Sequence, residues 1–211
     1  MSVGSDLLRF SDRKIVIWDK ETQRVNTLQD NLPFECAWVV TQRGRILSRH
    51  QYYLRWPDFR MSPDAARITR FNPAWVANGD DPEFVLEAWE SYAMDESYLL
   101  AGHNVLTFDL PVWQLWRRAC GRQPDWSPAN RIIDSHLLAR AYKEGWKPDR
   151  ENLLAWQYKV SGAHRKGVKT SLGLMAKEFE IPVDPNQQHG AMYDLELNAA
   201  VLWKLINLME I

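Results

Sequence analysis

Four carboxylates and one histidine, placed in three short motifs, are the residues of this chain best suited to chemistry. Asp19 and Glu21 lie in Ile-Val-Ile-Trp-Asp-Lys-Glu-Thr, Asp109 closes Gly-His-Asn-Val-Leu-Thr-Phe-Asp, and His189 and Asp194 bound His-Gly-Ala-Met-Tyr-Asp. Carboxylate oxygens suit Mg²⁺ or Mn²⁺ better than zinc. A histidine titrates near neutrality and can take a proton from water. Brought together around metal ions, this set would suit cutting a phosphodiester.

Each motif also has an ordinary structural explanation. Residues two apart in an extended chain point the same way, so Asp19 and Glu21 would face one side, but a charged strand end facing water does the same. Asp109 at a helix start would complement the helix dipole. His189, taken alone, is most simply a surface histidine in a loop, while Asp194 falls in the first turn of a helix, beside its apolar stripe.

The elements that must position these residues indicate an α/β protein. We expect a buried strand at residues 14–18. A hairpin is expected from residues 35–41 and 45–56, which flank the Gly-containing turn at 42–44. Two short apolar strands are expected at residues 98–101 and 132–133. Helices are expected at 64–69 after the cap Ser62, at 82–94 after the cap Asp81, and at 110–119, 135–142 and 151–160.

Two more helices are expected near the C-terminus, one capped by Ser171 and running to residue 179, and one at 191–209. The last has the clearest apolar stripe. It consists of Leu195, Ala199, Leu202, Ile206 and Met209. Strands that come first and then alternate with helices favour an α/β domain with a mixed sheet.

Composition sets limits on the class of protein. At 211 residues we expect one domain spanning 1–211, and the net charge of −1 provides no overall basic field. That weakens a pure nucleic-acid-binding interpretation, but not an enzyme whose metal ions supply the positive charge. Cys36 and Cys120 favour reduced thiols. With no signal-peptide core and no membrane-length apolar stretch, we expect a cytoplasmic, soluble protein without membrane contact.

Taken in order, the three motifs resemble the DnaQ-like, or DEDDh, family of 3′→5′ exonucleases, and the resemblance runs from about residue 14 to 209. Asp-x-Glu-Thr at 19–22, Gly-His-Asn with Phe-Asp at 102–109, and His-x-Ala-x-x-Asp at 189–194 resemble the family's three exonuclease motifs. Ile-Ile-Asp-Ser at 132–135 and the segment from Ser171 resemble further family segments. The resemblance implies the RNase H-like fold, a five-stranded mixed β-sheet flanked by α-helices.

The resemblance also implies a two-metal hydrolysis with Mg²⁺ or Mn²⁺, two ions per site and about 3.5–4 Å apart. By this likeness Asp19 bridges both ions, Glu21 and Asp194 help hold the ion that carries the nucleophilic water, and Asp109 serves the other. His189 takes the proton from that water. The products would be nucleoside 5′-monophosphates.

Substrate contacts are expected from Thr22, through its backbone, and from Asn104 and Phe108. Arg165 and Lys166 belong to a basic loop at 159–169, which is either a solvated loop or a grip on backbone phosphates. Asp134 is expected to orient a neighbour rather than bind metal.

Some residues depart from the family pattern. Gln23-Arg24 replaces the usual Thr-Gly, and three residues rather than two separate Asn104 from Phe108, as in the exonuclease I branch. The tyrosine branch would need Tyr at position 190, which is Gly, so the histidine branch fits better.

Single-stranded 3′ ends are the expected substrate, with DNA slightly favoured. An exoribonuclease or oligoribonuclease-like trimming of RNA is the alternative, because no residue can be assigned to reading the 2′-hydroxyl. A non-catalytic binding scaffold of the same fold is a third hypothesis, which the loss of a metal carboxylate would have indicated, and none is lost. A polymerase or another replication or repair protein is the expected partner chain.

Overall fold

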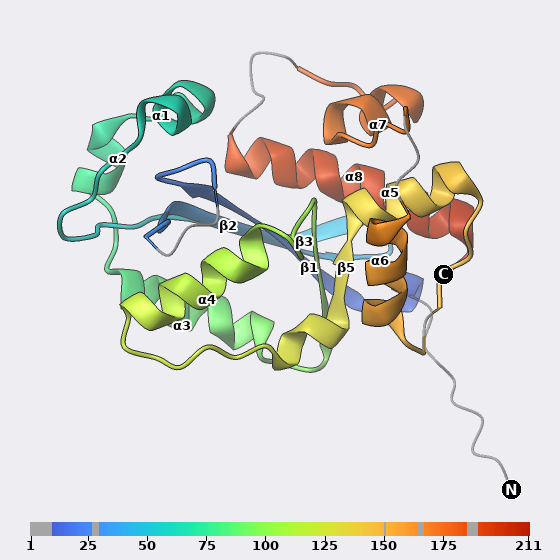
Figure 1. Cartoon of the computed structure of the whole chain (residues 1–211), viewed down its shortest axis with the longest axis horizontal. Helices are drawn as coiled ribbons and strands as arrows, with labels where there is room; N and C mark the ends of the chain where they lie inside the picture. Colours follow the sequence, from blue (N-terminus) through green and yellow to red (C-terminus); the bar gives the residue numbers. More distant parts are fainter. Residues whose placement is uncertain (1–9, 27–29, 150, 164–166, 185–189) are drawn as a thin grey trace, which may run out of the picture.

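A computed structural model describes residues 10–26, 30–149, 151–163, 167–184 and 190–211. Five strands form one sheet in the order β3-β2-β1-β4-β5, which places β1 at its centre (Figure 1). The strands are β1 (Lys14–Thr22), β2 (Pro33–Gln42), β3 (Arg45–Tyr53), β4 (Tyr98–Gly102) and β5 (Ile132–Asp134). The sheet is mixed, since β1 pairs antiparallel with β2 and parallel with β4. The predicted fold class is therefore confirmed.

Strand β1 is longer than the sequence predicted. Its pairing with β4 covers Lys14 to Ile17, but its pairing with β2 continues to Thr22 opposite Pro33. The prediction of a strand at 14–18 was therefore too short, because hydropathy alone does not reveal a partner strand that continues past the apolar run. The consequence is that Asp19 and Glu21 lie inside a paired strand rather than after it.

The predicted hairpin forms, with Arg43 and Gly44 in the left-handed conformation at its turn (φ 50° and 76°). Strand β3 ends at Tyr53 rather than at residue 56. The next residue, Leu54, pairs with Asp80 as an isolated bridge, while its N–H still donates to the Phe34 carbonyl of β2 at 2.8 Å.

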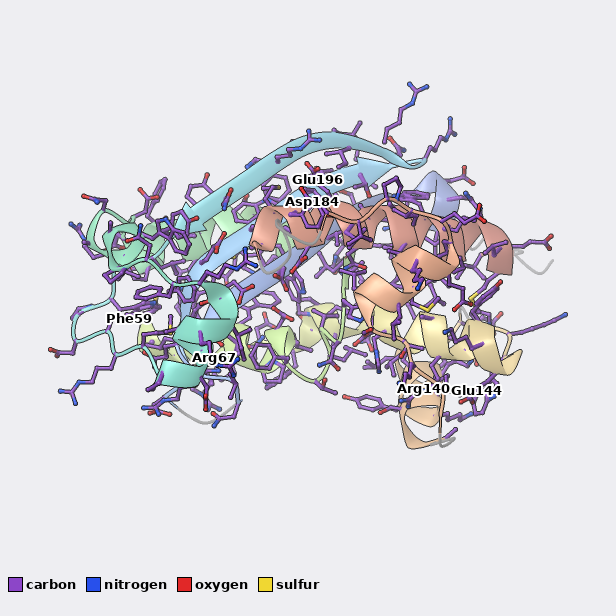
Figure 2. All side chains as sticks on the ribbon, turned by 90° about the horizontal axis from the view of Figure 1, so that it is seen from above. Phe59, Arg67, Arg140, Glu144, Asp184 and Glu196 are labelled. Carbon is purple, nitrogen blue, oxygen red and sulfur yellow. The ribbon has the colours of Figure 1, made fainter. Side chains whose placement is uncertain are left out.

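Helices cover both faces of the sheet. The helix α8 (Ala191–Met209) packs on β1 and β2 on one side, supported by α5 (Ser135–Glu144) and α7 (Leu172–Glu178). Figure 1 shows α3 (Pro82–Ala93) and α4 (Asp109–Ala119) on the other side. In the view of Figure 2, α8 lies along the strands, and its Glu196 pairs with Arg49 of β3 at 2.6 Å. The remaining helices are α1 (Pro63–Thr69), α2 (Pro73–Ala77), α6 (Leu153–Gly162) and the short 3₁₀ turns at Phe10–Asp12 and Ser127–Arg131.

Local capping accounts for several helix boundaries. The Ser62 hydroxyl accepts from the Ala65 N–H at 3.3 Å, and the Asp81 carboxylate accepts from the Glu83 N–H at 2.9 Å, as predicted. Ser171 occupies the predicted cap position of α7, but its side chain makes no capping hydrogen bond. Helix α2 was not predicted, although Asn72-Pro73 is a cap-and-proline start signal.

The buried faces of the helices differ in one place from the sequence pattern. The stripe on α8 is buried from Leu195 to Ile206, with Met209 partly exposed. On α3, Phe84 is 54% exposed although it is a large apolar residue, whereas Leu86 is fully buried. Among the described residues, no helix combines the length and the apolar character needed to cross a membrane.

Candidate active site

The two carboxylates of β1 point to the same face of the sheet, because side chains alternate along a strand. Asp19 and Glu21 are both partly exposed, whereas Lys20 and Thr22, which point the other way, are buried. Burial raises the pKa of Glu21 to about 8, and the negative charges of Glu35, Asp194 and Asp109 act in the same direction. The pair therefore lies at the boundary between the core and solvent, not on a freely solvated strand end.

Asp109 is the first residue of α4 and is 3% exposed. Burial raises its pKa to about 7, against the lowering effects of the Lys20 charge and the Lys20 backbone N–H. Its Oδ1 atom is buried and has no hydrogen-bond partner among the described residues. Asp109 therefore keeps one carboxylate oxygen that the start of its own helix does not satisfy.

The loop before Asp109 is held by a second carboxylate, that of Asp134 at the end of β5. Its Oδ1 accepts from the Asn104 N–H at 2.9 Å and its Oδ2 accepts from the Leu106 N–H at 3.1 Å. Asn104 has a left-handed backbone (φ 63°), a conformation that this anchoring maintains. Asp134 thus has the orienting role that the sequence suggested, and it fixes the backbone that leads into α4.

Asp194 lies in the first turn of α8, which begins after the N-cap Gly190. Its side chain is partly exposed, as expected for a residue beside the apolar stripe rather than in it. His189, the predicted general base, lies outside the described residues, as do Arg165 and Lys166 of the basic loop.

Asp19 is where the three motifs meet. Its pKa is raised well above the ordinary value by burial and then by the negative charges of Asp109, Glu21, Asp194 and Glu35. The predicted carboxylates of β1, α4 and α8 are therefore near enough to one another to interact electrostatically. Within the described ranges, however, no three His, Cys, Asp or Glu side chains are gathered tightly enough to hold a metal ion as they stand.

The chemistry of this donor set fits a hard divalent cation. All four motif carboxylates offer oxygen ligands, and one of them, Asp109, has a buried oxygen that no described group satisfies. Buried carboxylates with raised pKa values need either protons or cations. Mg²⁺ or Mn²⁺ held by Asp19, Glu21, Asp109 and Asp194 would meet that need.

Lys20 is a residue of the site that the sequence did not single out. It is 3% exposed, and its Nζ lies 4.2 Å from the ring centre of Trp18 and 5.2 Å from that of Trp89. Its Nζ has no hydrogen-bond partner among the described residues. The contacts are therefore of the cation–π kind, and they keep a positive charge beneath the carboxylates. A lysine between two acidic residues would ordinarily be expected to face water.

Glu35 is a fifth carboxylate beside the site. It stands opposite Glu21 in the β1–β2 register and is 4% exposed. Burial raises its pKa to about 7, while the hydrogen bond from Gln51 Nε2 (2.7 Å) lowers it. An acidic residue in the otherwise apolar run at 34–40 was the available signal for it.

The three described residues that were predicted to contact substrate differ in their exposure to solvent. Thr22 is 4% exposed, and its hydroxyl donates to the Arg24 carbonyl at 2.6 Å, which leaves its backbone as the predicted point of contact. Phe108 precedes α4 and is partly exposed. Thr107 Oγ1 donates to the Asn104 side-chain oxygen at 2.6 Å, so Asn104 also stabilises its own loop.

A family model described as an exonuclease (RNase T) matches residues 16–202, which include all three motifs. Among curated proteins, the chain is similar to the PolC-type DNA polymerase III of Listeria monocytogenes, with 23% identity over 199 residues. That match covers 94% of this chain but only 12% of the polymerase.

Solved structures show the same fold. Escherichia coli Exonuclease I in complex with a dA16 oligonucleotide has a TM-score of 0.71 and 18% identity, covering 93% of this chain and 43% of that one. Exonuclease X in complex with 5′ overhanging duplex DNA has a TM-score of 0.62 and 24% identity, covering 93% of both chains. Another similar structure is a zinc-ion-bound form of an E. coli Exonuclease I complex with single-stranded DNA.

Proposed function

The chain belongs to the DnaQ-like exonuclease family, within the RNase H-like superfamily, and on that premise we propose that it is a metal-dependent 3′→5′ exonuclease acting on single-stranded DNA ends. The observation that carries the proposal is the environment of Asp19 in β1, whose pKa is raised by burial and then by the negative charges of Asp109 of α4, Glu21 of β1 and Asp194 of α8. The proposed exonuclease domain is the whole chain, with its core at residues 14–209.

The proposed site divides its work among the motif residues. Asp19, Glu21, Asp109 and Asp194 would hold two Mg²⁺ or Mn²⁺ ions. Bound there, divalent cations supply a nucleophilic hydroxide at neutral pH and stabilise the charge that develops on the phosphate. The carboxylates must be ionised to bind cations, so the raised pKa values of Glu21 and Asp109 make cation binding and proton release compete.

The other motif residues would accept the proton of the attacking water and contact the 3′ end of the substrate strand. His189 would accept the proton of the attacking water. The buried Thr22, held by its hydrogen bond to the Arg24 carbonyl, would offer its backbone to the terminal nucleotide. Cleavage of the bond between phosphorus and the O3′ of the penultimate nucleotide then leaves a 3′-hydroxyl on the shortened strand and releases the terminal nucleoside 5′-monophosphate.

DNA is preferred over RNA as the proposed polymer because the similar proteins are a DNA polymerase and exonucleases solved with DNA. The same likeness supports a role in replication or repair with a polymerase as the partner chain. The predicted cytoplasmic location stays a prediction.

The test is the shortening of 5′-labelled single-stranded DNA and matched RNA, with Mg²⁺, Mn²⁺ or EDTA. We expect a ladder that shortens from the 3′ end, only with metal, and faster on DNA. Asp19→Ala should lose on the order of 10³-fold in rate, since metal stabilisation contributes several kcal/mol to such reactions. Asp64→Ala, which removes an exposed carboxylate from α1, should match the wild type.

Three results would contradict the proposal. They are activity in EDTA, unchanged activity of Asp19→Ala, or no shortening of either polymer with either metal. Faster shortening of RNA than of DNA would overturn the preference for DNA while leaving the exonuclease assignment intact.

A further inference from the structure

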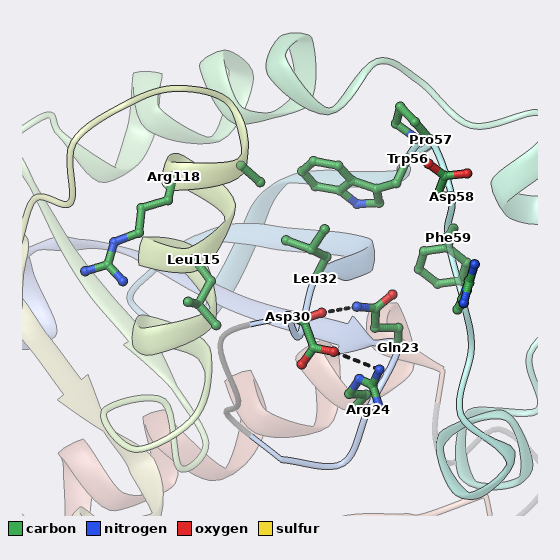
Figure 3. Close-up of a pocket in the computed structure, with 12 residues that line it drawn as sticks. Gln23, Arg24, Asp30, Leu32, Trp56, Pro57, Asp58, Phe59, Leu115 and Arg118 are labelled. Atoms are coloured by element: carbon green, nitrogen blue, oxygen red, sulfur yellow. Dashed lines mark hydrogen bonds and ion pairs between the residues drawn. The ribbon is translucent and has the colours of Figure 1, made fainter.

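A pocket of about 540 Å³ opens beside the end of β1, and no residue of the exonuclease motifs lines it. Its lining comes from three places: the segment after β1, the segment after β3, and the C-terminal half of α4 (Figure 3). Gln23, the first of its lining residues, directly follows Thr22. The pocket is therefore a neighbour of the proposed active site and is built separately from it.

Two sides of the pocket carry apolar residues. Leu32, Trp56 and Phe59 lie on one side and Leu115 of α4 on the other, as Figure 3 shows. Trp56 is fixed, since its indole N–H donates to the Pro33 carbonyl at 2.6 Å. A fixed wall of aromatic and aliphatic side chains is suited to the flat face of a nucleobase.

The rim of the pocket is cationic. Three arginines and two aspartates line it, and Arg24 is already paired with Asp30 at 2.7 Å. Arg60 and Arg118 are exposed, and the guanidinium group of neither makes a hydrogen bond or ion pair within the described part of the chain. After Asp58 offsets one of these two arginines, the pocket lining still carries a net positive charge in a chain whose net charge is −1, which favours an anionic ligand.

Hydrogen bonds within the chain hold the segment after β1, which lines the pocket, in place without a ligand. Asn31 is fully buried; its side-chain oxygen accepts from the Arg24 N–H at 3.0 Å, and its amide donates to the Arg24 carbonyl at 3.2 Å. The Gln23 carbonyl accepts from the Ser62 N–H at 2.9 Å, which ties the segment after β1 to the start of α1. Such preorganisation lowers the ordering cost of binding.

From this combination we propose that the pocket binds one nucleotide of the substrate strand, with its base against Phe59 and Trp56 and the phosphates on its two sides held by Arg60 and Arg118, one by each. The proposal rests on the proposed exonuclease function, because the strand reaches this pocket only if its 3′ end occupies the carboxylate site. It extends substrate contact beyond the motif residues to α4 and to the segment after β3.

The test is the binding of a short fluorescent single-stranded DNA to the full chain in EDTA, followed by anisotropy over a range of salt concentrations. Arg60→Ala and Arg118→Ala should each weaken binding several-fold and lower the slope of log affinity against log salt by about 0.7, the value for one phosphate contact on a single strand. Phe59→Ala should weaken binding about tenfold with an unchanged slope.

Controls separate binding from folding and charge. Arg43→Ala removes an exposed arginine at the far turn of the β2–β3 hairpin and should leave both affinity and slope unchanged. Phe59 also contacts Phe34 and Phe71, so Phe59→Tyr, which keeps the ring, should bind as the wild type does. Arg60→Lys should restore the salt slope that Arg60→Ala loses.

The outcomes distinguish this proposal from the proposed function. Wild-type affinity and slope in Arg60→Ala, Arg118→Ala and Phe59→Ala would overturn the nucleotide pocket, even if the wild type shortens DNA. Such a result would instead favour a protein ligand for the same surface. Pocket variants that lose affinity while the wild type fails to shorten DNA with metal would support the pocket as a nucleic-acid site and overturn the exonuclease.

Discussion

The two faces of β1 differ in the side chains that they carry and in how far these are buried. One face carries Asp19 and Glu21, which are partly exposed and whose pKa values are raised first by burial and then by neighbouring carboxylates. The other carries Trp18 and Lys20, both almost fully buried. Trp18 lies 4.3 Å from Trp89 and 5.4 Å from Trp113, measured between ring centres.

The comparison shows how a destabilising site is maintained on a stable strand. Like charges drawn together by burial oppose folding, whereas a packed aromatic cluster favours it. Because both belong to one strand, the aromatic face fixes the backbone that positions the acidic face. Function on one face therefore depends on packing on the other.

The largest effect on the free energy of unfolding is expected from removing a ring of the aromatic cluster that packs on the Trp18 face of β1. Trp89 is fully buried, so Trp89→Ala should lower the free energy of unfolding by about 3–5 kcal/mol. Urea unfolding measures this, and Trp126→Ala, at a tryptophan that is 51% exposed, is the matched control. A loss as small in Trp89→Ala as in Trp126→Ala would refute the idea that the aromatic cluster stabilises the strand.

The acidic face should make the metal-free protein less stable as pH rises. The pKa of Glu35 is raised from 4.5 to about 7 in the folded state, so the folded chain retains a proton that the unfolded chain has already released. The stabilisation is fully present below pH 4.5 and is lost as pH rises through 7. By pH 8 the loss in the free energy of unfolding is about 3 kcal/mol.

Glu35→Gln should remove that part of the pH dependence, because an amide does not ionise and its oxygen still accepts the Gln51 hydrogen bond. Urea unfolding in EDTA at pH 5 and pH 8 compares it with wild type and with Glu87→Gln, at a side chain that is 65% exposed. The same fall in stability in all three proteins would show that Glu35 is not held protonated by the fold.

The smallest effect concerns Lys20, which links the two faces. Lys20→Met keeps the volume and removes an ammonium without a described hydrogen-bond partner, so stability should change by about 1 kcal/mol or less. The pKa of Asp109 should rise above its wild-type value of about 7, because the lysine charge lowers it. Carboxyl ¹³C titration of the metal-free protein measures the shift, with Lys14→Met as control. An unchanged Asp109 pKa in Lys20→Met would contradict the idea that the charge of Lys20 acts on that carboxylate.

Local patterns were enough to predict much of this structure. The spacing of Asp19 and Glu21 fixed their common face, and the periodic stripe on α8 located that helix from Ala191 to Met209. These features depend on short-range geometry, which the order of residues determines directly.

Features created by distant contacts escaped prediction. Lys20 is buried only because Trp89 arrives from α3, and β1 extends to Thr22 only because β2 pairs with it. The pocket requires segments after β1 and β3 to meet α4, which no local pattern reveals. His189 was predicted from its motif, and it lies outside the described residues.

Thermal unfolding of the wild type and Asp19→Asn at pH 8, in EDTA and in Mn²⁺, tests most directly whether the acidic face is a cation site that opposes folding until it is filled. In EDTA, Asp19→Asn should melt above the wild type because one of the crowded carboxylates is gone. Mn²⁺ at a hundredfold excess over its dissociation constant should stabilise the wild type by about 2.7 kcal/mol and Asp19→Asn much less. A wild type that melts at the same temperature with and without Mn²⁺, or an Asp19→Asn variant that melts lower in EDTA and responds equally to Mn²⁺, would contradict it.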